Sequence, residues 1–275
     1  MPVVEIAGAR VHYLVDGSGP GLVLVHGTGG NAGTSWTPML ERLTARWTVV
    51  RPDYSGSGAT RDDGGPLTLP GLARQVVAAA ERAGLASFHL LGYSLGALVA
   101  VQAAADYPAQ VRSLVALGGF VSGADPRLQM MLKFWQDLIA RDRAAIARLW
   151  VLSGFSPAFL STLTPAELEA IVELNLAVVD WDGVARQIDL DLTADVHGAA
   201  ARVVAPTLVL GCRQDQMVPP AHARDLAACI PGATYRELDS GHAAPVEAAG
   251  PLLDLVEPFF RAVEVESLAA QAAAR

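Results

Sequence analysis

The sequence predicts an α/β fold class: a doubly wound, mostly parallel sheet into which a helical cap is inserted. Short runs of Val and Leu bounded by Gly or polar residues alternate with helical stretches through residues 1–120, as strands buried on both faces do. Residues 121–196 show helical patterns without a buried strand, and the alternation resumes at residue 197. We therefore expect a core formed by residues 1–120 and 197–275, with residues 121–196 as a cap, or lid, on the sheet's edge.

Each element follows from a local signal. Residues 3–15 are expected to form a strand or hairpin, because the turn formers Asp16-Gly17-Ser18-Gly19-Pro20 follow them. Buried strands are expected at residues 22–25, 47–50, 88–91, 111–117 and 207–210, and a further strand at 234–238. Helices are expected at residues 72–83 and 95–106 in the core, and at 127–138, 143–152, 165–179 and 184–190 in the cap. The Ala-rich residues 263–275 either extend the final helix or fray.

The composition excludes several classes of protein. The chain of 275 residues is 52% hydrophobic and 17% charged, which is too apolar for a disordered segment. Its net charge is -8 and it has no run of Lys or Arg, so we expect neither nucleic acid nor a membrane surface as a partner. Because the sequence shows no signal-peptide pattern and no apolar stretch of membrane length, we expect a cytoplasmic protein.

Metal and cofactor binding are not expected. Cys212, Cys229 and the six histidines show no metal-ligand spacing, and the two cysteines are most simply free thiols. We expect no metal and no organic cofactor. We expect a small-molecule substrate as the partner. A homodimer is the alternative to a monomer.

The sharpest chemical signal is the segment Gly92-Tyr93-Ser94-Leu95-Gly96, which follows one expected strand and opens the next helix. A serine in so sharp a strand-to-helix turn takes a strained backbone conformation, and a glycine two positions to either side lets strand and helix approach. The helix N-terminus supplies free N–H groups and a positive partial charge near the hydroxyl. We expect Ser94 to be a nucleophile; the alternative is a serine that caps the helix.

A nucleophilic serine needs a base and an acid that orients the base. His242 lies on a loop after a late strand, and Asp215 lies just beyond another buried strand. The order Ser94, Asp215, His242 is the order expected for such a triad, and the interval between the last two accommodates one helix and one strand. Asp239 is a weaker candidate for the acid, because it lies in a tight turn close to the histidine in sequence.

The Gly-rich loop that starts at Gly27 is expected to bind the oxyanion. Its backbone N–H groups, with Thr28 as the expected donor beside Leu95, would face the reacting carbonyl oxygen, and Gly27 and Gly29 would line the substrate site. His26 is expected to brace this loop by hydrogen bonds.

The same loop also matches a loose dinucleotide-binding fingerprint. Gly27, Gly29 and Ala32 follow a strand, and Asp53 ends the next one, where it could bind a ribose. The strand is not the first of the chain, and this alternative leaves the triad candidates unexplained.

Taken together, these motifs resemble those of the α/β-hydrolase fold family. The resemblance rests on His26-Gly27, on the D-x-x-G-x-G turn at residues 53–58, on the elbow at residues 92–96, on residues 205–211 leading to Asp215, and on Gly241-His242. It covers about residues 3–120 and 197–261. By this resemblance, the insertion is the family's variable cap domain, which shapes the substrate pocket.

Two features bear on which branch of that family the sequence resembles. Ser94 argues against the branch that uses an aspartate nucleophile. The loop with Trp36 resembles hydrolases that split C–C bonds, yet Ala243 stands where that branch usually has a tryptophan. A C–C hydrolase would also need a carboxylate-binding arginine, for which the candidates are Arg127, Arg141 and Arg148.

The cap is expected to give an apolar substrate pocket. Its tryptophans, Trp135, Trp150 and Trp181, are the candidate substrate contacts, and the alternative is that they pack the cap helices on the core. The function expected is that of a serine hydrolase acting on a small, largely apolar carboxylic ester, lactone or thioester. The alternatives are C–C bond hydrolysis, cofactor-free haloperoxidase-like activity, a non-hydrolytic biosynthetic reaction, and a ligand receptor without turnover.

Overall fold

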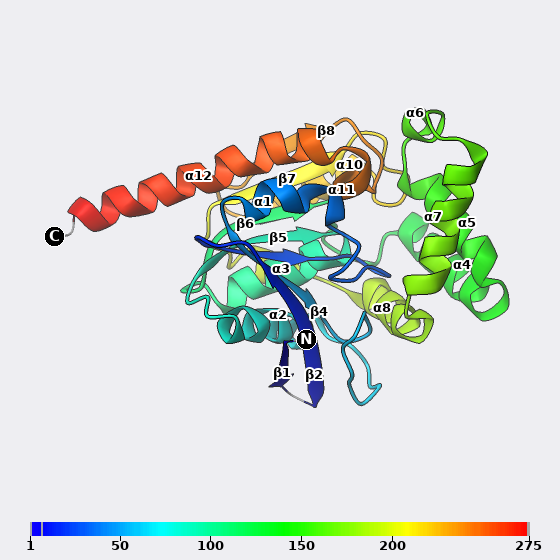
Figure 1. Ribbon diagram of the computed structural model, residues 1–275, viewed down its shortest axis with the longest axis horizontal. Coiled ribbons are helices and arrows are strands. Elements are labelled where there is room, and N and C mark those ends of the chain that lie inside the picture. The colour runs from blue at the N-terminus through cyan, green and yellow to red at the C-terminus, as the bar shows by residue number, and fades with distance from the viewer. Residues whose placement is uncertain (1, 7, 274–275) are drawn as a thin grey trace.

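The computed structural model describes residues 2–6 and 8–273 and has one eight-stranded sheet with helices on both faces (Figure 1). The strand order is β1-β2-β4-β3-β5-β6-β7-β8. Strands β3 to β8 run parallel to one another, whereas β2 pairs antiparallel with β4 and with the edge strand β1. The predicted fold class is therefore confirmed. The strands are β1 (Val3–Ile6), β2 (Ala9–Asp16), β3 (Gly21–Val25), β4 (Thr48–Asp53), β5 (Phe88–Tyr93), β6 (Val111–Leu117), β7 (Thr207–Cys212) and β8 (Thr234–Leu238).

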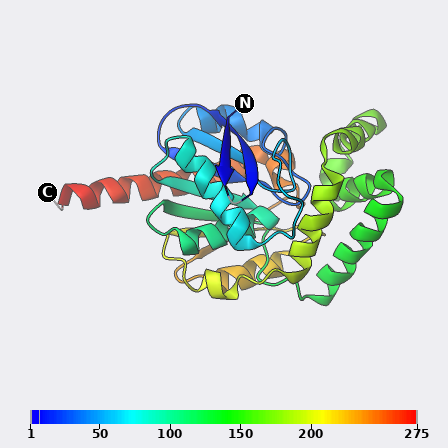
Figure 2. The same ribbon diagram turned by 90° about the horizontal axis from the view of Figure 1, so that it is seen from below.

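The helices form three groups (Figures 1 and 2). One face of the sheet packs against α2 (Leu69–Arg82), α3 (Leu95–Asp106) and α10 (Pro220–Cys229), and the other packs against α1 (Leu40–Thr44) and α12 (Ala249–Ala273). The third group comprises α4 (Pro126–Arg141), α5 (Arg143–Gly154), α6 (Pro157–Leu160), α7 (Pro165–Val178) and α8 (Trp181–Thr193). Three short segments complete the fold: η1 (Thr37–Met39), α9 (His197–Ala200) and α11 (Ala244–Glu247).

The sheet separates two apolar cores because successive side chains of a strand point to opposite faces. In β3, Val23 and Val25 join the core under α2 and α3, whereas Leu22 and Leu24 join the core under α12. All four side chains are fully buried. This burial on both faces explains why the central strands are continuous apolar runs rather than alternating patterns.

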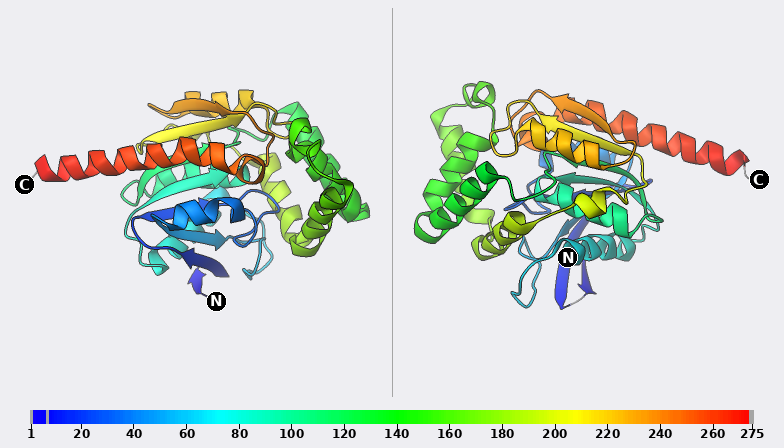
Figure 3. Two further views of the ribbon diagram at one scale, coloured as in Figure 1. Left: turned by 45° about the horizontal axis from the view of Figure 1, so that its top comes forward. Right: turned by 180° about the vertical axis from the view of Figure 1, so that it is seen from behind.

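Helices α4 to α8 all lie within residues 121–196 and form a layer at one end of the sheet (Figure 3). The two ends of this segment pair with each other, because the N–H of Gly123 donates to the carbonyl oxygen of Ala194 at 2.8 Å and Val196 donates to Val121 at 2.9 Å. The segment therefore leaves and re-enters the core at one place.

Several expectations about local structure differ from the structure in detail. The expected strand at 47–50 begins one residue later and runs on to Asp53. The strand or hairpin expected at 3–15 corresponds to β1 and β2, which pair antiparallel. The short helix α1 has no counterpart among the expected helices, since five residues are too few for a helical repeat to show. The final helix continues to Ala273, and residues 274–275 of the expected extension lie outside the described residues. No helix among the described residues is long and apolar enough to cross a membrane.

Helix α8 lies directly on the turn after β4. A Cβ atom at Gly183 would lie 2.2 Å from the carbonyl oxygen of Gly56, which is backbone and cannot rotate away. Only a glycine at position 183 allows this approach of α8 to the core.

Gly183→Ala is therefore expected to destabilise the protein by about 1–3 kcal/mol, because the added methyl group forces α8 away from the turn. Urea denaturation measures the change in the free energy of unfolding. Gly198→Ala is the matched control: a Cβ there meets no described atom within 4 Å, and alanine favours a helix. An equal loss of stability in both variants would contradict the close approach of α8.

Candidate active site

The turn between β5 and α3 holds Ser94 in a strained conformation. Ser94 has φ 57° and ψ -125° and is the one non-glycine residue with positive φ in the part of the chain described. The hydroxyl makes no capping hydrogen bond to α3, so the alternative of a helix-capping serine does not hold. Such strain at a single residue is typical of a functional site.

The two flanking glycines are required by backbone contacts. A Cβ at Gly92 would lie 2.1 Å from the carbonyl oxygen of Gly96, and a Cβ at Gly96 would lie 2.1 Å from that of Val25. Both contacts involve backbone, so no side chain can move to relieve them. Strand β5, the start of α3 and the end of β3 therefore meet at one point, with Ser94 at its tip.

Ser94, His242 and Asp215 form a chain of hydrogen bonds. Nε2 of His242 lies 3.0 Å from Oγ of Ser94, and Nδ1 lies 2.6 Å from Oδ2 of Asp215. Because a carboxylate accepts, Nδ1 carries the proton and Nε2 is left to accept from the serine hydroxyl. Asp215 is held in turn, since its Oδ1 accepts the N–H groups of Met217 at 2.9 Å and Val218 at 2.7 Å.

Asp239, the weaker candidate for the acid, lies elsewhere. It is exposed, and its Oδ1 accepts a hydrogen bond from Gln214 at 2.9 Å. The helix α10 and the strand β8 lie between Asp215 and His242 in the chain, as their spacing predicted. The structure therefore brings Asp215, and not Asp239, to the histidine.

The loop after β3 lies beside Ser94, in the position predicted for it. A Cβ at Gly27 would lie 2.7 Å from Cβ of Ser94. Among the described residues, the backbone N–H groups of Thr28 and Leu95 have no hydrogen-bond acceptor, so both are free to bind an oxyanion. The Leu95 N–H also lies in the first turn of α3, where helix N–H groups lack an intrahelical partner.

His26 braces this loop as expected. Its ring is fully buried and stacks on Tyr54 with 4.2 Å between ring centroids. Nδ1 lies 2.9 Å from the carbonyl oxygen of Gly27, and Nε2 lies 3.1 Å from Oγ of Ser57. Burial lowers the pKa of His26, so the ring is a neutral structural group at neutral pH.

The structure argues against a dinucleotide-binding site, because Asp53, the acid that would bind the ribose, already has partners within the protein. Oδ1 of Asp53 accepts the N–H of Ala32 at 2.6 Å, and Oδ2 contacts Nδ1 of His12 at 2.7 Å and the N–H of Ala59 at 3.1 Å. The side chain is buried and has no oxygen left for a ribose. Asp53 therefore fastens the loop to the sheet.

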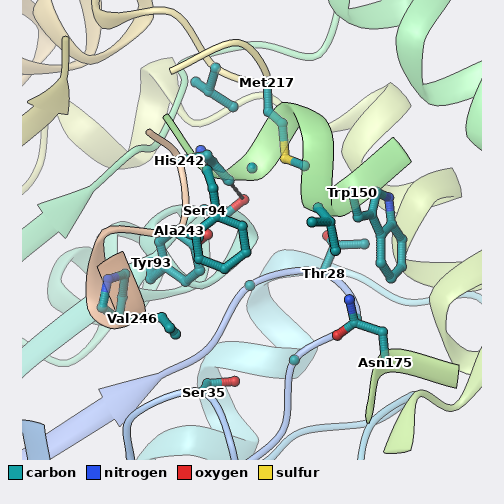
Figure 4. Close-up of a pocket in the computed structure, with 18 of the residues that line it drawn as sticks. Thr28, Ser35, Tyr93, Ser94, Trp150, Asn175, Met217, His242, Ala243 and Val246 are labelled. Carbon is teal, nitrogen blue, oxygen red and sulfur yellow. Dashed lines mark hydrogen bonds between the residues drawn. The ribbon is translucent and has the colours of Figure 1, made fainter. Parts of the chain in front are cut away.

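A cavity of about 290 Å³ opens above Ser94 and His242 (Figure 4). In this view Met217 lies above the serine, and Thr28 and, farther away, Trp150 lie to its right. Most of the apolar side chains in the wall come from the segment 121–196, among them Leu128, Met131, Leu132, Trp135 and Val151, and Phe120 directly precedes the segment. No Arg or Lys is among the described residues that line the cavity.

The three tryptophans predicted as substrate contacts divide into two groups. Trp135 and Trp150 line the cavity, and Trp150 packs on Gly29, where a Cβ would lie 2.9 Å from its ring. Trp181 is not among the described residues of the cavity wall. It lies behind Trp150, stacked on it at 5.6 Å, because the buried face of α8 directs the ring between helices. The expected substrate contact at Trp181 is thus corrected to a packing role.

The arginines considered for a carboxylate site also lie outside the cavity wall. Arg127 donates to the carbonyl oxygens of Gln216 and Met217, and Arg148 pairs with Glu169 at 3.0 Å on the surface. Arg141 is exposed as well. In the residues that the structure describes, no three His, Cys, Asp or Glu side chains come together as metal ligands.

Helix α8 contributes two buried polar residues that sequence analysis missed. Oε1 of Gln187 accepts the N–H of Gly29 at 2.9 Å, and its Nε2 donates to the carbonyl oxygen of Gly56 at 2.9 Å. Oδ2 of Asp191 accepts the hydroxyl of Thr28 at 2.6 Å. Their spacing of four residues, on the same helical face as buried Val184, is the signal that could have found them.

The fold and this arrangement of side chains define an α/β hydrolase. The chain belongs to the alpha/beta hydrolase fold family, whose model matches residues 20–249. It is 46% identical over 265 residues to pyrrolizixenacetamide deacetylase of Xenorhabdus hominickii, covering 96% of this chain and 100% of that protein.

Two further proteins are similar to this chain, one in sequence and one in fold. The chain is 32% identical over 244 residues to pimeloyl-acyl-carrier-protein methyl ester esterase of Xanthomonas campestris pv. campestris, with 86% of this chain and 92% of that one covered. Its fold matches the crystal structure of an enol-lactonase from Burkholderia xenovorans LB400 with a TM-score of 0.83, at 24% identity, over 94% of this chain and 100% of that chain.

Asp191→Asn is expected to change how stability depends on pH. Burial raises the pKa of Asp191 to about 7 in the folded protein, whereas the unfolded chain exposes the carboxyl at an ordinary pKa of about 4. Between these values the folded protein holds more protons, so the contribution of Asp191 to the free energy of unfolding falls as pH rises, by up to about 1.4 kcal/mol per pH unit. Urea denaturation at several pH values should show the variant gaining stability relative to wild type over this interval.

The control for that measurement is Asp189→Asn, which makes the same change on an exposed position of α8. The titratable neighbours that interact with Asp191, His242 and Tyr54, are present in every protein compared. A difference between wild type and Asp191→Asn that is independent of pH would show that burial does not raise this pKa.

Proposed function

We propose that the protein is a serine hydrolase that cleaves an acyl bond in a small, largely apolar substrate without a carboxylate near the reacting carbonyl. The observation that carries this proposal is the chain of hydrogen bonds from Asp215 through His242 to Ser94, which ends at the floor of an apolar cavity. A strained serine with a positioned base and acid is the arrangement that acyl transfer requires.

In this mechanism, Ser94 attacks the carbonyl carbon while Nε2 of His242 takes the hydroxyl proton. The oxyanion accepts hydrogen bonds from the N–H groups of Thr28 and Leu95, each donor contributing roughly 3 kcal/mol to transition-state stabilisation. His242 then returns the proton to the leaving group, and an acyl-enzyme remains. A water molecule, deprotonated by His242, releases the acid and restores Ser94. Asp215 orients the ring and stabilises its charged form.

The bond cleaved is proposed as an ester, lactone, thioester or amide. The relative that is 46% identical is named a pyrrolizixenacetamide deacetylase, and this similarity over nearly the whole chain adds amides to the bonds expected from the sequence. C–C bond hydrolysis is disfavoured, because Arg127, Arg141 and Arg148 all lie outside the described cavity wall. Cofactor-free haloperoxidase-like and non-hydrolytic reactions would use the same three residues and are distinguished by assay.

We further propose residues 121–196 as the cap of this enzyme. Its two ends pair where the segment leaves and re-enters the core, and it supplies about half of the residues that line the cavity, including most of the apolar ones. The substrate contacts proposed from the cap are Trp135 and Trp150, and those from the loop are Gly27 and Gly29.

A fluorophosphonate probe is expected to label Ser94 covalently in the wild type, as peptide mapping by mass spectrometry would show. His242→Ala should slow labelling by several orders of magnitude, because no base then takes the proton, and Ser94→Ala should abolish labelling and turnover while circular dichroism stays unchanged. Labelling at another residue, or at an unchanged rate in His242→Ala, would disprove the nucleophile assignment.

Asp215→Asn is expected to lower kcat by about four orders of magnitude, since an amide at this position favours the wrong tautomer of the histidine. The matched variant Asp239→Asn changes an exposed side chain that lies near Gln214, and it should keep kcat within about twofold of wild type. Steady-state kinetics on a chromogenic ester measures both. A large loss in Asp239→Asn alone would reverse the assignment of the acid.

A further inference from the structure

The loop that carries His242 packs directly against the backbone of the proposed cap. A Cβ atom at Gly241 would lie 2.5 Å from the nitrogen of Ser156 and 2.7 Å from the carbonyl oxygen of Gly154, so the two backbones are in contact. The N–H of Ala243 donates to that same carbonyl oxygen at 2.7 Å. The residues on both sides of His242 are therefore fixed against the end of α5.

One carboxylate oxygen joins these two backbones. Oε2 of Glu247, on α11, accepts the N–H of Ser156 at 2.8 Å and the N–H of Gly241 at 3.1 Å. Among the described residues, neither N–H has another acceptor. Gly241 and Ser156 are both buried, where an N–H without an acceptor is costly. Loss of the carboxylate would leave two buried donors unpaired, one in the loop of the base and one in the cap.

His242 has to meet two partners that lie on other elements of the core. Nε2 lies 3.0 Å from Oγ of Ser94, and Nδ1 lies 2.6 Å from Oδ2 of Asp215. Because one ring spans both partners, a shift of the loop backbone changes at least one of these distances. Misplacement of a reacting group by about 1 Å can cost about a hundredfold in rate. The contacts that hold the loop therefore affect the reaction through the position of this ring.

We propose that Glu247 is a positioning residue, which holds His242 in place by joining its loop to the cap, and that the base is correctly placed only while residues 154–156 are docked on this loop. The inference rests on the proposed function of Ser94. It goes beyond that function because it makes the cap a part of the catalytic geometry as well as a wall of the cavity. Glu247 is not among the described residues that line the cavity, so it acts through His242 and not on the substrate.

The first test compares two substitutions of Glu247 by steady-state kinetics on a chromogenic ester. Glu247→Ala is expected to lower kcat between about tenfold and about a hundredfold. KM should stay within about threefold of wild type, because the cavity wall keeps its side chains. Glu247→Gln should keep kcat within about fivefold of wild type, since its amide oxygen also accepts N–H groups. Glu173→Ala is the control, because it removes an exposed glutamate of α7, and it should keep kcat within about twofold.

The second test shows whether Glu247 acts through His242. The fluorophosphonate probe should label Ser94 more slowly in Glu247→Ala, by a factor close to the loss in kcat, because attack by the hydroxyl needs the base. In His242→Ala no ring is left to position. Adding Glu247→Ala to that variant should therefore leave the slow residual labelling rate unchanged within about twofold. A residue that only supports the fold would slow the residual labelling further.

Hydrogen exchange measured by mass spectrometry checks the contact itself. Peptides that contain Ser156 or Gly241 should both exchange faster in Glu247→Ala than in wild type, because both N–H groups lose their acceptor. The peptide that contains Ser94 should exchange as in wild type. Should circular dichroism show that Glu247→Ala is unfolded, Glu247→Asp replaces it, because its carboxylate ends one methylene group short of the two N–H groups.

The outcomes separate this inference from the proposed function. Failure of the probe to label Ser94 in wild type would overturn the proposed hydrolase. Labelling of wild type would leave the hydrolase standing, and the role of Glu247 would then be overturned by any of three results. These are an unchanged kcat in Glu247→Ala, an equal loss in Glu247→Gln, and a further loss of labelling when Glu247→Ala is added to His242→Ala.

Discussion

The contact of three backbone segments at Ser94 is the constraint on which the rest of the structure depends. Strand β5 can turn into α3 within one residue because Gly92 and Gly96 have no side chain, and Gly96 lies against the end of β3. The same contact brings the loop after β3 beside the serine. One tight turn therefore sets the position of the proposed nucleophile, of the first free N–H of α3 and of the loop that carries Thr28.

The second constraint is the way in which the segment 121–196 is fastened over this turn. Helix α8 is joined to the core by the buried side chains of Gln187 and Asp191 and by the contact of Gly183 with Gly56. Near the middle of the segment, at the end of α5, the carbonyl oxygen of Gly154 accepts the N–H of Ala243 at 2.7 Å. The loop of Thr28 and the loop of His242 are thus each held by a helix of the same segment.

The sequence was sufficient to predict features that depend on neighbouring residues. The elbow at Ser94 could be predicted because its glycines and its position between a strand and a helix are local, and Asp215 and His242 could be predicted because both follow strands of a parallel sheet. For Asp191 and Gln187 the sequence offers only their shared helical face. Their partners could not be predicted, because α8 docks on loops more than a hundred residues away in the chain.

The remaining differences have the same origin in tertiary packing. Trp181 was predicted to contact substrate, yet the rotation of α8 on the core turns it behind Trp150, and no periodicity fixes that rotation. Asp53 resembled a ribose-binding acid because its partners, the N–H of Ala32 and the ring of His12, are distant in sequence. Composition indicated an apolar cap, but only packing decides which of its side chains reach the cavity.

The uneven attachment of the segment 121–196 has a consequence for access to Ser94. Helix α7 has one buried side chain, Val172, and packs chiefly on α5, whereas α8 is joined to the core by buried hydrogen bonds. Displacing α7 costs little apolar burial, while displacing α8 breaks the contacts that hold the loop of Thr28. A substrate that enters beneath α7, past Leu174 and Asn175 on the cavity wall, would reach the serine while the proposed oxyanion donors stay in place.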